Sequence, residues 1–187
     1  AVLFVLLVAG GLTNNVAAAN THSVELEADN SQYLFISDEY QDGLSASDDF
    51  SISFWVKLEN TGVLQPLVGK WGDGTDAQSE YRMWIDTDNK VYLSWKNQPS
   101  GADRTTVRMD STLSSNNWYH VAATVDVNSG ASGVTIYLNN SSQSLATVHN
   151  NATTLNDGSG PFWIGYNSDL GGYLDGLMDD VRLWSRE

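Results

Sequence analysis

The strongest constraint on the fold is a two-residue alternation of apolar and polar side chains that recurs along most of the chain. Its clearest stretch is 50–58, FSISFWVKL, where every second residue is a large apolar one. Because successive side chains of a strand point to opposite faces, this pattern is typical of a strand with one buried face. It predicts further strands at 24–28, 33–37, 65–71, 80–85, 91–95, 118–126, 134–139, 162–166 and 178–184.

Turns rich in Gly, Asp and Asn separate these stretches, and no segment shows a sustained helical period with caps. The three prolines lie at or beside turns or strand starts, which leaves the strand interiors free to hydrogen-bond. About ten to fourteen short strands with such frequent turns indicate an antiparallel sandwich or barrel. We see no internal repeat or linker, so the sequence predicts one all-β domain.

The N-terminal residues differ in composition from the rest. Residues 1–9, AVLFVLLVA, are all apolar, and Ala17-Ala18-Ala19 precedes Asn20. The run is shorter than the about 20 apolar residues of a transmembrane helix, and it resembles a signal peptide with its cleavage site. We therefore interpret 1–19 as a truncated signal segment and 20–187 as the mature domain. The alternative is a buried N-terminal strand. The first interpretation predicts a secreted or cell-surface protein whose mature domain does not insert into membranes.

The charge and the reactive residues exclude several classes of function. Nine Lys and Arg against 23 Asp and Glu give a net charge of −14, which would be repelled by nucleic acid and anionic membranes. The charge is compatible with cations, with neutral ligands such as glycans and with a basic partner. The predicted partner is a glycan or an extracellular protein. The absence of cysteine excludes disulfides, thiolate metal sites and a cysteine nucleophile. The three histidines have no partner motif for a catalytic triad or a zinc site.

Glycoside hydrolysis needs only two carboxylates, about 5–9 Å apart, and is the remaining enzymatic alternative. The best candidate pair is Glu27 and Asp29, but Gln32 stands where a third acid would complete an E-x-D-x-x-E array. The pair also lies in the first predicted strand, which is normally an edge position. We therefore expect no catalysis.

Four segments of the sequence are distinctive in their order and spacing. They are 31–57, 67–95, 116–126 with 133–140, and 162–186. Together they resemble the laminin-G-like branch of the concanavalin A-like lectin/glucanase superfamily over about residues 23–186. One small departure is Asn140, which stands where a glycine usually closes a Y-x-N-G turn. The resemblance implies a jelly roll of two antiparallel sheets, in agreement with the alternation.

The resemblance also implies a class of function and a cofactor. Members bind glycans or proteins, often with Ca²⁺, and commonly serve as modules of secreted or surface proteins. The family's positions for a structural Ca²⁺ fall on Asp29 and Asp179, with Asp49 close by. In an alternative rim site they fall near Glu80 and Asp169. Seventeen Asp residues, many in loops, supply the oxygen ligands that Ca²⁺ prefers.

Exposed aromatic residues are the expected contacts for a sugar ring. We expect Trp71 and Tyr173 to flank a binding rim, with most of the other tryptophans, including Trp55 and Trp118, packing structurally. The predicted function is a non-catalytic carbohydrate-binding or adhesion module, part of a larger extracellular protein. The alternatives are a glycoside hydrolase of the same fold and a structural domain for protein–protein interaction. The predicted ligand-binding residues are Trp71, Asp73, Asp76, Asp169 and Tyr173.

Overall fold

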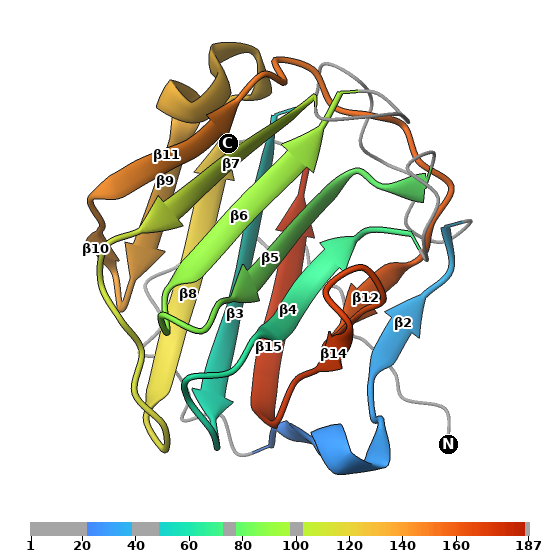
Figure 1. Ribbon diagram of the computed structural model, residues 1–187, viewed down its shortest axis with the longest axis vertical. Coiled ribbons are helices and arrows are strands. Elements are labelled where there is room, and N and C mark those ends of the chain that lie inside the picture. Colours follow the sequence, from blue (N-terminus) through green and yellow to red (C-terminus); the bar gives the residue numbers. More distant parts are fainter. Residues whose placement is uncertain (1–21, 39–48, 73–77, 98–102, 186–187) are drawn as a thin grey trace, which may run out of the picture.

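Two large antiparallel sheets lie face to face in the computed structural model (Figure 1). It describes residues 22–38, 49–72, 78–97 and 103–185. The first sheet has six strands in the order β1 (Val24–Leu26), β15 (Gly176–Trp184), β3 (Phe50–Leu58), β8 (Trp118–Val125), β9 (Val134–Leu138) and β10 (Ser141–Ser142). The second has seven, in the order β11 (Leu145–Asn150), β7 (Arg104–Met109), β6 (Val91–Lys96), β5 (Tyr81–Ile85), β4 (Gln65–Lys70), β12 (Phe162–Ile164) and β2 (Leu34–Ile36). The all-β, two-sheet prediction is confirmed.

Smaller elements complete the fold. A two-stranded ribbon of β13 (Tyr166–Asn167) and β14 (Gly172–Tyr173) connects β12 to β15. Two short 3-10 segments, η1 (Ala28–Asn30) and η4 (Val127–Gly133), lie in connections. Among the described residues, no helix is long and apolar enough to cross a membrane. The interpretation of 1–19 as a signal segment falls outside the described residues.

The inner faces of the two sheets form one hydrophobic core, and the strand alternation sets which side chains enter it. The apolar residues of β3 face β5 and β6 of the other sheet, and they are almost completely buried. This layer of aromatic and branched side chains replaces disulfides as the source of stability. Its central members are Phe50, Ile52, Phe54, Val56, Leu58, Tyr81, Met83, Ile85, Val91, Leu93 and Trp95.

All ten predicted strands are present, most of them shorter by one or more residues, but β7 and β11 were missed. In β7 the inward residues are Thr105, Val107 and Met109. Because threonine counts as a polar residue, the apolar–polar alternation of this strand is incomplete. The edge strand β11 is largely exposed, so it has little apolar signal. The segment 86–90 is a hairpin turn between β5 and β6, as expected, with Asn89 at a positive φ of 61°.

Candidate functional site

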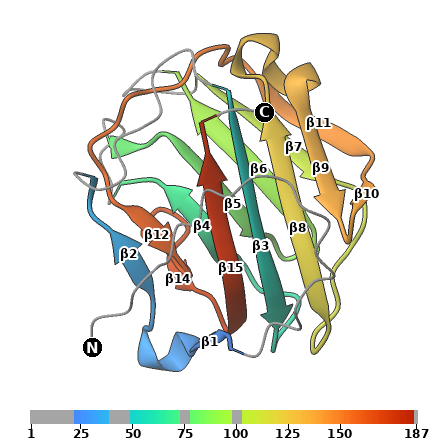
Figure 2. The same cartoon turned by 180° about the vertical axis from the view of Figure 1, so that it is seen from behind.

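Cross-strand pairing aligns one row of residues over the outer face of the seven-stranded sheet. Aromatic residues occupy its β2 end, and small or polar residues occupy its middle and far end. Figure 2 shows the molecule from behind, where β2 and β12 again lie side by side at one edge. The row runs Phe35, Trp163, Gly69, Arg82, Ser94, Thr106 and His149.

An aromatic cluster, which we define as Tyr33, Phe35, Trp163, Tyr166 and Tyr173, covers the β2 end of this face. The Tyr33 ring is stacked at 5.1 Å from Tyr166 and at 6.1 Å from Tyr173. The rings of Phe35 and Trp163 lie 5.5 Å apart. Phe35 is 58% exposed and Tyr33 is 40% exposed, so the cluster presents aromatic surface to solvent. It joins β2 to β12 and the β13–β14 ribbon, which follow β2 by more than a hundred residues in the chain.

Trp71 lies next to the cluster, but it is not the exposed contact that we expected. It is only 1% exposed, and its indole nitrogen donates to Asp169 Oδ2 at 2.6 Å. The Arg82 guanidinium lies 3.9 Å from the Trp71 ring centroid, and the Ser168 hydroxyl donates to the Gly72 carbonyl oxygen at 3.2 Å. The loop between β13 and β14 therefore packs onto the strand end at Trp71, which explains the wrong expectation.

Arg82 and Lys96 are buried cations that lie over the Trp71 ring, and Lys96 Nζ is 4.9 Å from its centroid. Burial lowers the pKa of Arg82 to about 10, although the Asp169 carboxylate, 3.7 Å from Nη1, acts in the opposite direction. Arg82 Nη1 also donates to Asn167 Oδ1 at 3.3 Å. The contacts among Arg82, Trp71 and Asp169 therefore anchor the loop of the β13–β14 ribbon. This ribbon carries two members of the aromatic cluster, Tyr166 and Tyr173.

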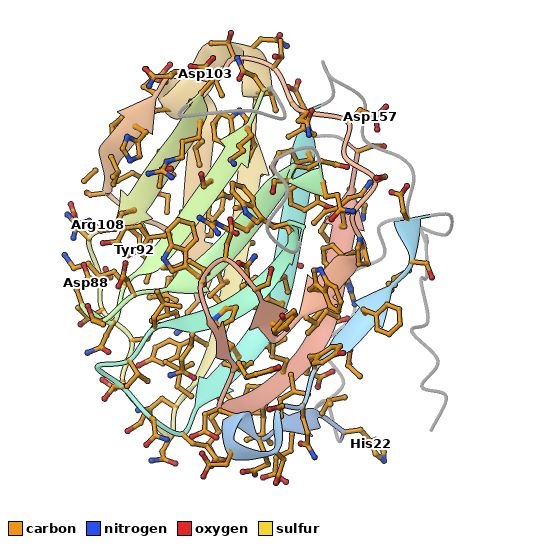
Figure 3. The ribbon with its side chains drawn as sticks, turned by 45° about the vertical axis from the view of Figure 1, so that its right-hand side comes forward. His22, Asp88, Tyr92, Asp103, Arg108 and Asp157 are labelled. Atoms are coloured by element: carbon orange, nitrogen blue, oxygen red, sulfur yellow. The ribbon has the colours of Figure 1, made fainter. Side chains whose placement is uncertain are left out.

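The far side of the same face is occupied by internal contacts (Figure 3). Tyr92 stacks on Trp84 at 5.1 Å, and its hydroxyl donates to Asp88 Oδ2 at 3.1 Å. Arg108 Nη1 pairs with the same carboxylate oxygen at 3.4 Å, and all three labelled side chains lie at one edge in Figure 3. These groups satisfy one another, whereas the aromatic cluster presents exposed aromatic rings to solvent.

The outer face of the six-stranded sheet contains a separate hollow of about 500 Å³. Trp55 is 37% exposed and Trp118 is 40% exposed, whereas both were expected to be structural. The sequence does contain a signal for the exposure of Trp55. Trp55 alternates with the buried Phe54 and Val56, so its side chain points to the opposite, outer face of the strand. The described residues that line the hollow are Trp55, Trp118, His120, Asn139 and Asn140.

The predicted Ca²⁺ ligands do not come together. Leu26 pairs with Gly176 in antiparallel strands, so Asp29 and Asp179 lie in opposite directions from this pair. Asp175, not Asp179, reaches the turn beside Asp29, where its carboxylate accepts from the Ala28 amide at 3.4 Å. Asp179 pairs with Trp55 of β3. Asp49 precedes β3 and lies six residues before Trp55, which is about 20 Å along the strand. The residues proposed from the resemblance therefore do not fit one Ca²⁺ site, and the ion itself stays a prediction.

The two acids of the alternative rim pair have different partners, because Glu80 is buried against Lys70 while Asp169 contacts Trp71 and Arg82. The acids that do gather are Glu25, Glu27 and Glu59, whose carboxylate oxygens lie within 4.8 Å of one another. Desolvation and then the charge of Glu59 raise the pKa of Glu27.

The remaining predicted residues divide into two groups. Tyr173 lies in the aromatic cluster, half-buried, and Asp169 is exposed beside it. Asp73 and Asp76 fall outside the described residues. Tyr33 and Phe35 were missed, although their stretch YLFI places Tyr33 and Phe35 on the face opposite Leu34 and Ile36.

Comparisons with known proteins agree with this fold. CBM40 of the Ruminococcus gnavus IT-sialidase, solved bound to α2,3-sialyllactose, is 12% identical, with a TM-score of 0.59 over 88% of this chain and 90% of that one. Mouse laminin α1 domains LG4-5 are 18% identical, with a TM-score of 0.57 over 86% of this chain and 40% of that one. Domain 4 of AbnA, a GH43 extracellular arabinanase from Geobacillus stearothermophilus solved with arabinotriose, is 18% identical, with a TM-score of 0.55 over 95% and 77%.

These likenesses establish the fold. For several of the similar structures the chain spans less than half of that protein's length. No curated protein matches the chain in sequence. A laminin-G family model described as the concanavalin A-like lectin/glucanases superfamily matches residues 28–187. The chain therefore belongs to the laminin-G-like branch of the concanavalin A-like lectin/glucanase superfamily.

Proposed function

We propose that the domain is a non-catalytic carbohydrate-binding module that holds glycans on the aromatic cluster of its seven-stranded sheet. The observation that carries this proposal is the exposed aromatic surface of Tyr33 and Phe35. A sugar ring has an apolar C–H face that can stack on such rings, and hydroxyl groups at its edge. The tyrosine hydroxyls of the cluster can donate and accept hydrogen bonds at that edge.

The rigidity of the cluster supports the same proposal. Its rings contact one another and are anchored by the β12–β2 pairing and by the β13–β14 ribbon. A surface that is already ordered loses little side-chain entropy when a ligand binds. The similar structures from the sialidase and the arabinanase were solved with saccharides, which supports a glycan as the ligand.

Catalysis is not part of this proposal. Among the described residues, one group of three acids, Glu25, Glu27 and Glu59, lies on and beside the edge strand β1. β1 belongs to the six-stranded sheet, whereas β2 and β12 of the aromatic cluster belong to the seven-stranded one. Glu27 is connected to the start of the cluster, because its amide donates to Gln32 Oε1, next to Tyr33, at 3.1 Å. We expect no hydrolysis of β-glucans, and the same result for Glu27→Gln. Measurable hydrolysis that is lost in Glu27→Gln would favour the glycosidase alternative. We further propose that the module acts outside the cell, as part of a larger protein.

Binding to an array of immobilised glycans, followed by calorimetry on the best ligand, tests the proposal. Phe35→Ala and Tyr33→Ala should each weaken binding by about tenfold or more, equivalent to about 1.4 kcal/mol. Val148→Ala is the matched control, since Val148 is similarly exposed but lies on β11, at the opposite edge of the sheet. Unchanged affinity in both aromatic variants would refute the site. Binding to an extracellular protein but to no glycan would favour the protein-interaction alternative.

A further inference from the structure

We propose that the six-stranded sheet carries a second saccharide site, a hollow in which a neutral sugar residue stacks on Trp55 or Trp118. The site lies on the opposite sheet from the aromatic cluster and does not depend on it. It would make the module two-faced, able to contact two glycan segments at once.

The strand register places both indoles on the same outer face. Trp55 of β3 pairs with His120 of β8, and Trp118 is two residues before His120. Such diagonal neighbours lie about 7–8 Å apart, within reach of each other's side chains. The ring of His120 lies 5.1 Å from that of Trp55, so the floor of the hollow is aromatic. Its volume, about 500 Å³, is in the range of small-molecule sites.

The wall of the hollow supplies hydrogen-bonding groups at defined positions. Asn139 and Asn140 form the turn from β9 to β10, with positive φ angles of 49° and 68°. Asn139 Oδ1 accepts from the His120 amide at 2.9 Å, which orients that side chain and leaves its amide nitrogen as a donor. Within the described residues, no hydrogen bond engages the Asn140 side chain. The two amides can therefore bind hydroxyl groups of a ligand above the rings.

The charges select a neutral ligand. The described lining residues include no carboxylate and no Lys or Arg. Beside the hollow, Asp179 pairs with Trp55 and Lys57 pairs with Trp118, and these two charges have opposite signs. Burial lowers the pKa of His120, and the nearby charges of Asp180 and Arg182 act on it in opposite directions. Burial therefore favours the neutral imidazole. A site for an ammonium ligand would contain carboxylates, and a site for a carboxylated or sulfated ligand would contain cations. The amides, imidazole and indoles of this hollow instead suit a ligand with uncharged hydroxyl groups.

Indole N–H signals in two-dimensional NMR test this site directly, because the chain has seven tryptophans. The full chain is produced in a host without N-glycosylation, since Asn139 and Asn140 both lie in Asn-x-Ser sequons. The probes are arabinotriose, cellotriose and lactose, each titrated to about 20 mM, a range suited to a weak, shallow site. The expected result is a saturable shift of the Trp55 and Trp118 signals with at least one probe.

Variants connect these shifts to the hollow. Trp118→Ala should raise the dissociation constant measured at Trp55 by about tenfold or more. Asn140→Gly removes the amide but keeps the turn, because glycine tolerates a positive φ, and should raise the constant about threefold. Trp184→Ala is the matched control, since Trp184 is the last residue of β15 in the same sheet and does not line the hollow. Trp55 and Trp118 signals that do not move with any probe, or shifts that survive both variants, would overturn the proposal.

The same spectra separate this proposal from the first one. Trp163 belongs to the aromatic cluster and reports on the seven-stranded sheet. If Trp163 shifts while Trp55 and Trp118 do not, the second site is refuted and the proposed function stands. If only Trp55 and Trp118 shift, the second site is supported and the aromatic cluster is refuted. If no signal moves, both are refuted.

Discussion

Burial of Glu80 should make its contribution to the stability of this domain fall as pH rises from acidic to neutral values. Lys70 Nζ lies 2.5 Å from Glu80 Oε1 and 2.5 Å from Asp38 Oδ1, and both Lys70 and Glu80 are buried. The Gly158 amide also donates to Glu80 Oε1, at 3.0 Å. Burial nevertheless raises the pKa of Glu80 from 4.5 to about 7, against the opposing effects of Lys70 and of this amide.

The sign follows from proton linkage. The folded chain binds a proton at Glu80 in a pH range where the unfolded chain has lost it. This contribution to the free energy of unfolding is therefore fully present below pH 4.5 and is lost as pH rises through about 7. The pKa of Glu80 is about 7 in the folded chain and 4.5 in the unfolded chain. At about 1.4 kcal/mol for each pH unit, this difference in pKa contributes about 3 kcal/mol to the free energy of unfolding.

Glu80→Gln removes the titrating group, so the comparison with wild type isolates it from the other acids. We expect the difference in unfolding free energy between the two proteins to change by about 3 kcal/mol between pH 4.5 and about pH 8. Urea denaturation followed by tryptophan fluorescence measures it. Asp103→Asn is the control for an equal change of charge at an exposed position. Lys70→Met should extend the dependence above pH 7, because it removes the cation that lowers the pKa. Parallel pH profiles for wild type and Glu80→Gln would refute the reasoning.

Three further predictions concern the outer face of the seven-stranded sheet. Gly69→Ala should lower stability by about 1–3 kcal/mol in thermal unfolding, because the added Cβ would lie 2.6 Å from the Arg82 Cα. Gly172→Ala is the control and should be nearly neutral, because its added Cβ would make only ordinary van der Waals contacts. Asp169→Ala should cost about 1–3 kcal/mol in urea unfolding by leaving the buried Trp71 indole N–H without its acceptor, and an unchanged midpoint would contradict this role. Binding of a neutral saccharide should not change between low and high salt in calorimetry, and a steep loss of affinity with salt would indicate charge recognition instead.

The sandwich was predictable because strand alternation reports directly on which side chains enter a shared core. Phe54 and Val56 show this, and so does the pairing of β3 with both β8 and β15. The same alternation does not say whether the opposite face is exposed to solvent. Trp71 and Trp55 both lie on outer faces, yet Trp71 is covered by the β13–β14 loop and by Arg82. Trp55 has no such cover and remains exposed. The difference depends on a loop about a hundred residues away, and a local pattern contains no information about it.

The charge distribution adds an argument about ligand chemistry that composition alone could not make. Cations are scarce in this acidic chain, and ion pairs with acids engage Lys70, Arg82, Arg108 and Arg182. None of these four lies in the aromatic cluster or among the described residues of the hollow. The aromatic cluster itself consists of rings and tyrosine hydroxyls, and the described lining of the hollow consists of rings and amides, on a protein whose net charge of −14 repels anions. A ligand that combines apolar C–H faces with uncharged hydroxyls matches this chemistry, and a neutral saccharide has both.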